Sequence, residues 1–466
     1  MDSTLDRLRR LQNLRPQKKS EEPSLPAPTP RPAVSEAPVN LQLPPNRKSR
    51  STKLETLIPG EEVETEFGPV YVVTKLYPLD EIRGLHSAGD LLHHTPNALA
   101  DLHPNFNLHN SDSFAHAAFI DTETTGLGGG AGIYAFMVGI GTYERVVREP
   151  SGREWRVDAQ SPTYQYIVRQ LFMRNPAEEP ALLSLLATLL ADKTLTVTFN
   201  GRGFDLPLLR TRYFFNRGLA PNGDMPVALE EEGVHLDLLM PARRLWKRRL
   251  QSCRLINLEA QILGLQRTGE DVPGQLIPQL YVDYVNTNDA RALQGIFYHN
   301  HEDVLTMVGL ATELYRTATP NSTRPPAQLD GLDWISLGQM YELQSKWAEA
   351  EAAYARAVEC LSVAIHQADS FARLAALYKR LERWQEATET WERWLTTVAG
   401  ADATPYIELA KYHEWRSGDL EQAEMWVKWA IHTLNAAPIQ QRVPGQMAEL
   451  EHRLARLQRK RSNKSE

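Results

Sequence analysis

Residues 117–127, Ala-Ala-Phe-Ile-Asp-Thr-Glu-Thr-Thr-Gly-Leu, combine a short apolar run with two acidic residues. The run at 117–120 predicts a buried β-strand. Because alternate residues of a strand point to the same face, the side chains of Asp121 and Glu123 are expected to lie together. Two converging carboxylates repel each other unless a cation lies between them, and Mg²⁺ or Mn²⁺ prefers such oxygen ligands. Taken alone, the pair could also be a solvated strand end.

The surrounding residues, 113–316, alternate strand-like and helix-like patterns, which is typical of an α/β sheet covered by helices. The patterns predict further strands at 134–143, 155–159, 194–199 and 234–238, and helices at 164–173, 180–192, 205–216 and from about 291 onward. The glycine-rich residues 126–132 lack the lysine and the spacing of a phosphate-binding loop. They therefore predict a tight turn between adjacent strands.

Two further acidic residues follow or interrupt predicted strands. Asp205 ends the sequence Asn-Gly-Arg-Gly-Phe-Asp, residues 200–205, which comes directly after the strand at 194–199. Since Asp205 also begins a predicted helix, it could instead be an acidic residue that stabilises the helix N-terminus. Asp237 lies within the short strand predicted at 234–238, and we expect it to support the site rather than to bind a metal directly.

The final helix of the α/β segment contributes another candidate ligand, Asp303. This residue lies on the polar side of a helix whose Val304 and Leu305 provide apolar contacts. Tyr298 and His299 come one helical turn or slightly more before Asp303, so either side chain could reach the same site. We prefer His299 as the general base, because imidazole titrates nearer neutral pH than phenol does.

Residues 242–249, Ala-Arg-Arg-Leu-Trp-Lys-Arg-Arg, predict a strongly basic helix. Its cations repeat every four residues and so form a stripe; they are Arg243 and Lys247, and Arg244 and Arg248. Such a run is usually a solvated helix face. If the acidic residues form a phosphodiester-cleaving site, contact with a phosphate backbone becomes the interpretation we adopt.

The flanking segments suggest further domains. Small and aromatic residues recur in three helix pairs at the spacing of tetratricopeptide (TPR) repeats, which are platforms for protein partners. Composition divides the chain into a proline-rich disordered tether with a short N-terminal helix (1–53), a small β-containing leader module (54–112), the α/β domain (113–316), a linker (317–330), three TPR-like helix pairs forming an all-α domain (331–434), and a capping helix with a basic tail (435–466).

The bulk composition excludes several classes of protein. The chain has 466 residues, of which 42% are hydrophobic and 23% charged, as in globular proteins. We find no apolar run long enough to cross a membrane and no signal peptide, so a cytoplasmic location is expected. Two cysteines, Cys253 and Cys360, are too few for a disulfide framework or a zinc knuckle. With a net charge of −7, nucleic acid would have to be bound through local basic patches and metal ions.

The order of the acidic residues resembles that of the DEDD class of 3′–5′ exonucleases, which are built on the RNase H-like fold: Asp121, Glu123, Asp205 and Asp303. Residues 200–207 are similar to the second exonuclease motif. The fuller pattern resembles the YprB-type RNase H-like domain in the segments 235–238, 241–248, 271–274 and 298–303. The resemblance covers residues 55–316 and does not include the helical repeats.

This resemblance implies a mixed sheet flanked by helices, in which the four carboxylates meet at one edge. There they would hold two Mg²⁺ or Mn²⁺ ions for phosphodiester hydrolysis. We expect Asp121 to bridge the ions, Glu123 and Asp303 to complete the site of the attacking water, and Asp205 to hold the second ion.

The candidate general base departs from the family pattern. One known subclass has a histidine five residues before the last aspartate, and the other has a tyrosine four residues before it. This chain has Tyr298 and His299 at those positions, in the reverse order. His299 remains the preferred base, but the reversed order keeps both residues as candidates for the general base. It is also compatible with weakened catalysis.

The resemblance further implies that Thr124, Asn200 and Phe204 contact the nucleic acid, Phe204 by stacking on a base. Phe204 could equally be a core residue of its helix. The favoured function is a metal-dependent 3′–5′ exonuclease with a TPR platform. The alternatives are a catalytically weak nucleic-acid-binding scaffold and a phosphoesterase acting on small nucleotides, and the basic stripe favours a polymer over a mononucleotide.

Overall fold

The computed structural model describes residues 51–103, 105–126, 132–148, 155–158, 160–216, 225–319, 329–398, 402–436 and 445–465. Several predictions fall on residues outside these ranges. They are the N-terminal helix and nearly all of the proline-rich tether, most of the glycine-rich turn, and most of the linker.

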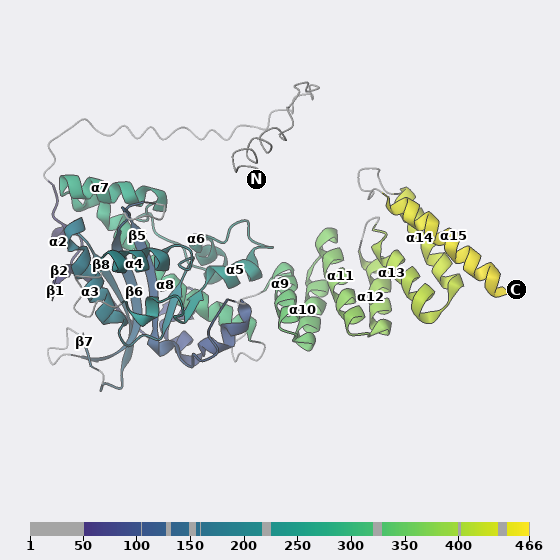
Figure 1. Cartoon of the computed structure of the whole chain (residues 1–466), viewed down its shortest axis with the longest axis horizontal. Helices are drawn as coiled ribbons and strands as arrows, with labels where there is room; N and C mark the ends of the chain where they lie inside the picture. Colours follow the sequence, from purple (N-terminus) through teal and green to yellow (C-terminus); the bar gives the residue numbers. More distant parts are fainter. Residues whose placement is uncertain are drawn as a thin grey trace, which may run out of the picture. The chain divides into compact units, whose positions relative to one another are not determined.

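Within the described residues, an eight-stranded mixed sheet forms the centre of the α/β part of the chain (Figure 1). Its strands are β1 (Glu61–Thr65), β2 (Gly68–Pro78), β5 (Ala117–Thr124), β6 (Ala135–Arg148), β7 (Trp155–Val157), β8 (Tyr164–Phe172), β9 (Leu195–Thr198) and β10 (His235–Asp237). The order is β1-β2-β8-β6-β5-β9-β10, and β7 pairs with β6. The pairs from β1 to β5 in this order are antiparallel, whereas β5 pairs in parallel with β9, and β9 with β10.

Helices cover both faces of this sheet, and a small hairpin of β3 (Ile82–Arg83) and β4 (His86–Ser87) lies apart from it. The helices are α2 (Leu54–Leu57), α3 (Glu179–Leu190), α4 (Asp205–Phe215), α5 (Leu239–Trp246), α6 (Leu255–Leu258), α7 (Ile277–Thr287) and α8 (Leu293–Ala318), with a π-helix at Glu259–Leu263. One face of β5 joins α3 and α4 in a buried cluster through Ala118 and Ile120. Phe119 on the other face joins a second cluster with Val304 of α8.

Most of the predicted strands and helices are present, but the helix predicted at 164–173 is wrong. These residues form the long strand β8. Both edges of β8 are hydrogen-bonded, to β2 and to β6, and its tyrosine, isoleucine, valine and phenylalanine residues suit a pleated strand. Strand β2, which the sequence places in the leader segment 54–112, belongs to the same sheet as β5.

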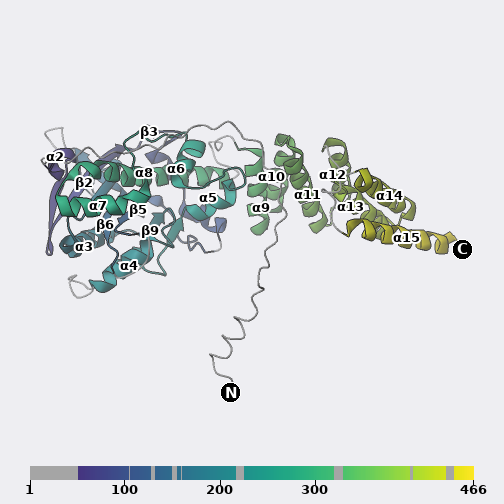
Figure 2. The same cartoon turned by 90° about the horizontal axis from the view of Figure 1, so that it is seen from above.

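Helix α8 packs against strands β5, β6 and β8 of the sheet (Figure 2). Two glycines of β6, Gly139 and Gly141, allow this packing to be close. A Cβ atom on Gly139 would lie 2.4 Å from Asn300 Oδ1. A Cβ atom on Gly141 would lie 2.8 Å from Val304 Cγ1 and 1.9 Å from the Tyr166 hydroxyl. These contacts are too short for any side chain, so the two glycines set the distance between α8 and the sheet.

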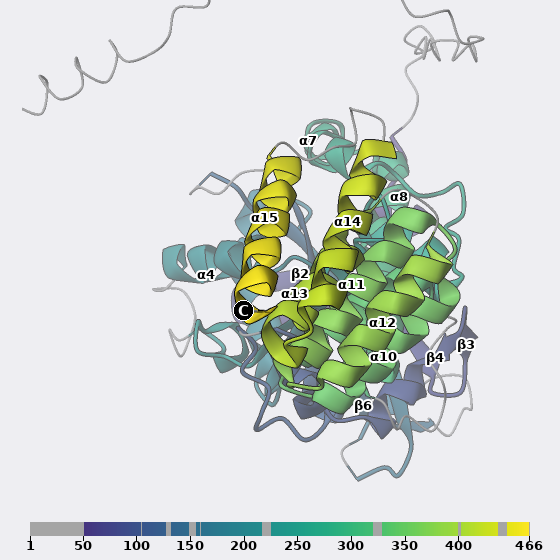
Figure 3. The same ribbon diagram turned by 90° about the vertical axis from the view of Figure 1, so that its right-hand side faces the viewer.

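The C-terminal part of the described chain is helical, and consecutive helices pack against each other; in Figure 3, α10 to α15 lie side by side. Its helices are α9 (Gly331–Leu343), α10 (Trp347–Cys360), α11 (Ala364–Arg380), α12 (Trp384–Thr397), α13 (Thr404–Tyr412), α14 (Leu420–Ala436) and α15 (Gln446–Ser465). At Gly338 of α9, an added Cβ would lie 2.4 Å from the ring of Tyr354, so the glycine permits the close contact of α9 with α10. The all-α prediction for this region is confirmed, whereas its assignment to the TPR class stays a prediction.

Helix α5 of the α/β part packs against α9. Arg249 donates to Asp333 in the first turn of α9 at 2.8 Å, and the Asp333 side chain is fully buried. Arg248 donates to Asp369 on α11 at 3.2 Å. One buried apolar cluster also includes residues of both parts, so the helical region and the sheet share a core. Among the described residues, no helix is long and apolar enough to cross a lipid bilayer.

Candidate active site

Asp121 and Glu123 lie on the face of β5 that α8 covers. Asp121 is paired with Gly139 in the register of β5 and β6, and Gly139 is paired in turn with Gln170 of β8. Because directly paired residues of antiparallel strands share a face, these three residues form a row beneath α8.

The side chain of Asn300, from α8, contacts this row and is fully buried. Its Nδ2 donates to Asp121 Oδ2 at 2.9 Å, and its Oδ1 accepts from Gln170 Nε2 at 3.0 Å. Gln170 also donates to the carbonyl oxygen of Phe297 at 2.7 Å. The amide of Asn300 is therefore fixed in one orientation, and it orients one carboxylate oxygen of Asp121.

Asp205 is the first residue of α4, and its carboxylate reaches across to β5. Asp205 Oδ1 accepts from the backbone N–H of Thr122 at 3.1 Å and from the Thr122 hydroxyl at 2.5 Å. These bonds join the start of α4 to the strand that carries Asp121 and Glu123. The loop before α4 is held by Asp237, which accepts from the backbone N–H groups of Asn200 at 2.9 Å and Arg202 at 3.1 Å.

Asp303 of α8 is bound by an arginine that lies between the π-helix and α7. Arg267 donates to Asp303 Oδ1 and, at 3.2 Å, to Asp271 Oδ2. Its Nε donates to Glu259 of the π-helix at 2.7 Å. Arg267 and Glu259 are almost completely buried, whereas the Asp303 side chain retains 17% of its exposure.

The four predicted acidic residues lie in one electrostatic environment. Burial and the negative charges of Asp303 and Asp205 raise the pKa of Asp121 well above its usual range, and burial and Asp121 do the same for Glu123. Burial raises the pKa of Asp205 to about 6, against the lowering effect of the Thr122 hydrogen bonds. Burial also raises the pKa of Asp303, although Arg267 opposes this shift. The structure thus brings the four carboxylates together in a setting that disfavours their combined negative charge.

This donor set fits a hard divalent cation by its chemistry, since buried carboxylates with mutually raised pKa values are stabilised by such an ion. Within the part of the chain that the structure describes, no group of three or more histidine, cysteine or acidic side chains is arranged to hold a metal ion as it stands. Three of the four carboxylates already have hydrogen-bond partners. Arg267 binds one oxygen of Asp303, Asn300 binds Asp121, and Thr122 binds Asp205.

Of the two candidate bases, His299 lies beside the acidic cluster. Its Nδ1 lies 2.7 Å from Asp271 Oδ1, and its Nε2 lies 3.7 Å from Asp303 Oδ2. The hydroxyl of Tyr298, in contrast, accepts a hydrogen bond from the backbone N–H of Thr268 at 2.9 Å.

A large cleft of about 1040 Å³ opens onto this cluster. His299, Asp303, Asp271 and Arg267 line it, together with Asn200, Arg243, Lys247 and Arg254. Asn200 has a left-handed backbone with a φ of 70°, which an asparagine tolerates better than most residues. A cleft of this size exceeds a single nucleotide and falls at the upper end of the range for ligand sites.

The remaining predicted contact residues lie elsewhere. Arg244 donates to the carbonyl oxygen of Leu102 at 2.9 Å, and Arg248 lies beyond the end of α5 against α9 and α11. The Thr124 hydroxyl donates to the carbonyl oxygen of Gly126 at 2.7 Å. Phe204 is half-buried at the start of α4 and is not part of the cleft lining. Of the predicted basic stripe, Arg243 and Lys247 therefore face the cleft.

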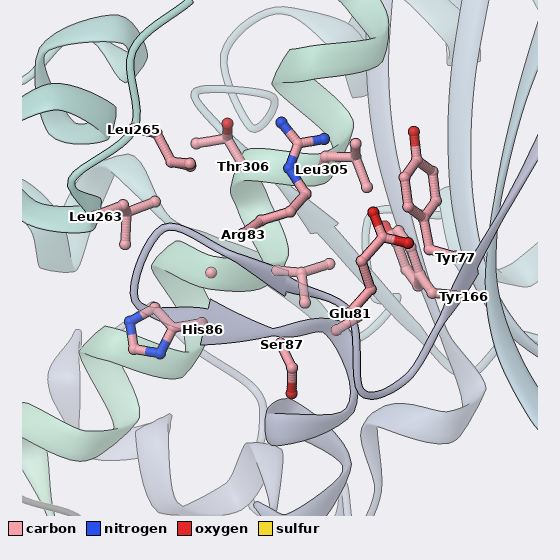
Figure 4. A pocket seen from close by; sticks show the side chains of 13 residues that line it. Tyr77, Glu81, Arg83, His86, Ser87, Tyr166, Leu263, Leu265, Leu305 and Thr306 are labelled. Atoms are coloured by element: carbon pink, nitrogen blue, oxygen red, sulfur yellow. The ribbon is translucent and has the colours of Figure 1, made fainter.

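A second cavity is lined by Leu305 and Thr306 of α8 and lies between Leu263 and Leu265 at one end and Tyr77 and Tyr166 at the other (Figure 4). Its volume is about 30 Å³, which is enough for a single water molecule. This cavity is too small for a substrate, and the large cleft is the candidate active site.

The sequence alone indicates no role for four residues of the site, Arg267, Asn300, Glu259 and Asp271. Asp271 and Asn300 lie within segments that carry the family resemblance, but nothing in those segments indicated their contacts. Arg267 and Glu259 lie outside them, and an isolated arginine or glutamate gives no signal in a single sequence.

Known proteins are similar to this chain in sequence. The RNase H superfamily matches residues 118–315, a range that includes all four acidic residues of the cluster. The chain is also 30% identical over 406 residues to "Uncharacterized protein YprB" of Bacillus subtilis (strain 168), which covers 83% of this chain and 85% of that protein. The chain therefore belongs to the family of YprB, and its residues 118–315 form a domain of the RNase H superfamily.

Proposed function

We propose that this protein is a metal-dependent nuclease that hydrolyses phosphodiester bonds, acting as a 3′–5′ exonuclease of the DEDD type with two Mg²⁺ or Mn²⁺ ions. The observation that carries the proposal is that four buried or half-buried carboxylates interact electrostatically and that one of them, Asp303, lines a cleft that also contains cationic side chains. Membership of the RNase H superfamily supports a nuclease.

In this proposal Asp121, Glu123, Asp205 and Asp303 hold the divalent ions. When bound, such ions lower the pKa of water and stabilise charge on the leaving oxygen. Asn300 orients Asp121, and the Thr122 hydroxyl orients Asp205, so each carboxylate presents its remaining oxygen.

His299 is the proposed general base. When Nδ1 donates to Asp271, the neutral ring carries its lone pair on Nε2, on the side of Asp303. A water molecule beside Asp303 can then lose its proton to Nε2. Tyr298 is a weaker candidate, because its hydroxyl already accepts a hydrogen bond from Thr268.

The substrate in this proposal is a nucleic acid strand that follows the cleft. Asn200 lies at one wall, on the loop that Asp237 anchors, and Arg243 and Lys247 provide positive charge for the phosphates. Replacing both Arg243 and Lys247 with alanine is expected to reduce the slope of log affinity against log salt by about 1.4, since each phosphate contact on a single strand contributes about 0.7. The measurement is fluorescence anisotropy with a labelled oligonucleotide at several salt concentrations.

The matched control for that experiment is the Arg244→Ala, Arg248→Ala variant, which removes the same charge from the same stretch of chain. Its slope is expected to stay near that of the wild type, because Arg244 and Arg248 contact Leu102, Gln339 and Asp369. Equal slopes for the two double variants would contradict the assignment of the cleft as the binding surface.

The test of the proposed activity is incubation of the purified full-length chain with end-labelled single-stranded DNA and RNA, with Mn²⁺ and with EDTA. Metal-dependent shortening from the 3′ end supports the proposal. Tight binding without cleavage would instead support a nucleic-acid-binding scaffold, an alternative favoured by the ion pair of Arg267 with Asp303.

We also propose that α9 to α14 are TPR-like repeats that bind a protein partner, because glycine and tyrosine pack together in the first helix pair as the repeat pattern requires.

A further inference from the structure

Arg267 is a cation buried inside the acidic cluster, and the proposed chemistry assigns it no role. Glu259 holds its guanidinium through two hydrogen bonds, of 2.7 Å from Nε and 2.5 Å from a terminal nitrogen. Glu259 in turn accepts from the Thr306 hydroxyl of α8 at 2.7 Å. Only 5% of the Arg267 side chain and 2% of the Glu259 side chain are exposed. The guanidinium is therefore fixed in position rather than free to swing into solvent.

The other N–H groups of Arg267 point to Asp303, which is a candidate metal ligand, and to two residues beside it. They donate to Asp303 Oδ1 and to Asp271 Oδ2, and one terminal nitrogen lies 3.4 Å from His299 Nδ1. Asp303 Oδ1 is thereby occupied, whereas Oδ2 faces His299. An incoming cation thus finds one oxygen of Asp303 instead of two.

A fixed positive charge also repels a second cation placed next to it, and the repulsion is stronger in a buried site than in water. We propose that Arg267 is a built-in counter-cation that competes with a divalent ion for Asp303 and so weakens metal binding to the resting protein. This inference rests on the proposed function, in that the acidic cluster is taken to bind a divalent ion. It adds that the affinity for the ion is set by a residue that is not a ligand.

The experiment measures Mn²⁺ binding to the full-length protein by isothermal titration calorimetry, without nucleic acid. The Arg267→Met variant is expected to bind Mn²⁺ about tenfold more tightly than the wild type, which corresponds to ~1.4 kcal/mol. Because this variant leaves Glu259 buried without its partner, the double variant Arg267→Met, Glu259→Gln is measured as well, and it is expected to show a gain in the same direction. The amide oxygen of the introduced glutamine can still accept the hydrogen bond from Thr306.

The matched control is Arg212→Met. Arg212 makes a similar buried pair with Glu179, with hydrogen bonds of 2.5 and 2.6 Å, two turns along α4 from Asp205. Loss of this pair is expected to leave Mn²⁺ affinity within about twofold of the wild type. Adding Asp121→Asn to Arg267→Met is expected to abolish the binding gained, which locates the ion in the acidic cluster.

The outcomes separate the two proposals. Tighter Mn²⁺ binding in both Arg267 variants but not in Arg212→Met supports the inference, even if no nuclease activity is found. Unchanged or weaker binding in both Arg267 variants, with measurable binding in the wild type, overturns the inference and leaves the nuclease proposal standing. Absence of binding in the wild type and in both Arg267 variants overturns both.

Discussion

The Asp121→Asn variant is expected to lose metal-dependent hydrolysis by a factor on the order of 10³ or more. Loss of an outer partner of a metal ligand costs about 10–100-fold, and Asp121 is a proposed direct ligand at the centre of the cluster. The measurement is the single-turnover rate on an end-labelled strand with Mn²⁺. A rate within about tenfold of the wild type would remove the acidic cluster as the catalytic site.

The same variant is expected to gain stability in the absence of metal, with a definite dependence on pH. The pKa of Asp121 in the folded protein lies above its unfolded value. The wild type therefore loses stability as the pH rises from the unfolded pKa through the folded pKa, and the loss is complete above the folded pKa. Asparagine resembles the protonated acid and removes this loss. Thermal unfolding in EDTA should show a higher melting temperature for the variant at about pH 8 and no difference near pH 4.

The matched control for both measurements is Asp283→Asn. Asp283 is a solvent-exposed acid of α7 that accepts from Gln279. This variant is expected to retain wild-type cleavage and an unshifted pH profile of stability. A variant at position 121 that lost activity and also unfolded at both pH values would point to a structural role for Asp121 instead.

Arg249→Ala is expected to destabilise the protein by about 3 kcal/mol, because it leaves the buried carboxylate of Asp333 without its ionic partner. Burial already raises the pKa of Asp333, and Arg249 opposes that shift. The measurement is the midpoint of urea unfolding followed by circular dichroism. The double variant Arg249→Ala, Asp333→Asn is expected to be more stable than Arg249→Ala alone, since the unpaired charge is removed.

An exposed ion pair provides the comparison for Arg249. Arg356 and Glu359 of α10 form a pair in which both side chains are more than half exposed, so Arg356→Ala is expected to change stability by no more than about 0.5 kcal/mol. If Arg249→Ala had an equally small effect, the contact between α5 and α9 would contribute little to holding the two parts of the chain together.

The parts of this structure that could be predicted from the sequence are those encoded by neighbouring residues. The apolar run before Asp121 specifies a buried strand, and strand geometry alone puts Glu123 on the same face. The helix with Asp303 was predictable from its apolar periodicity for the same reason. That these two elements lie close together could be expected only from the family resemblance, because no local feature of either segment specifies the distance between them.

The interactions that could not be predicted depend on several distant segments at once. Arg267 owes its position to Glu259 and to Asp303, which lies 36 residues further along the chain. Only part of the basic stripe faces the cleft, because Arg244 contacts Leu102, and Arg248, which lies beyond the end of α5, contacts α9 and α11. The strand at 164–172 was mistaken for a helix because its two partner strands, which stabilise it, are not visible in its own composition.

The glycines of β6 bear on how relatives of this protein should be judged. A chain that kept all four acidic residues but carried alanine at the equivalents of Gly139 and Gly141 would have to lift α8 away from the sheet, and Asn300 and Asp303 with it. The presence of the four carboxylates would then be a poor guide to whether such a relative is active. Glycine at these two positions is thus as informative about the geometry of the site as the presence of the acidic residues.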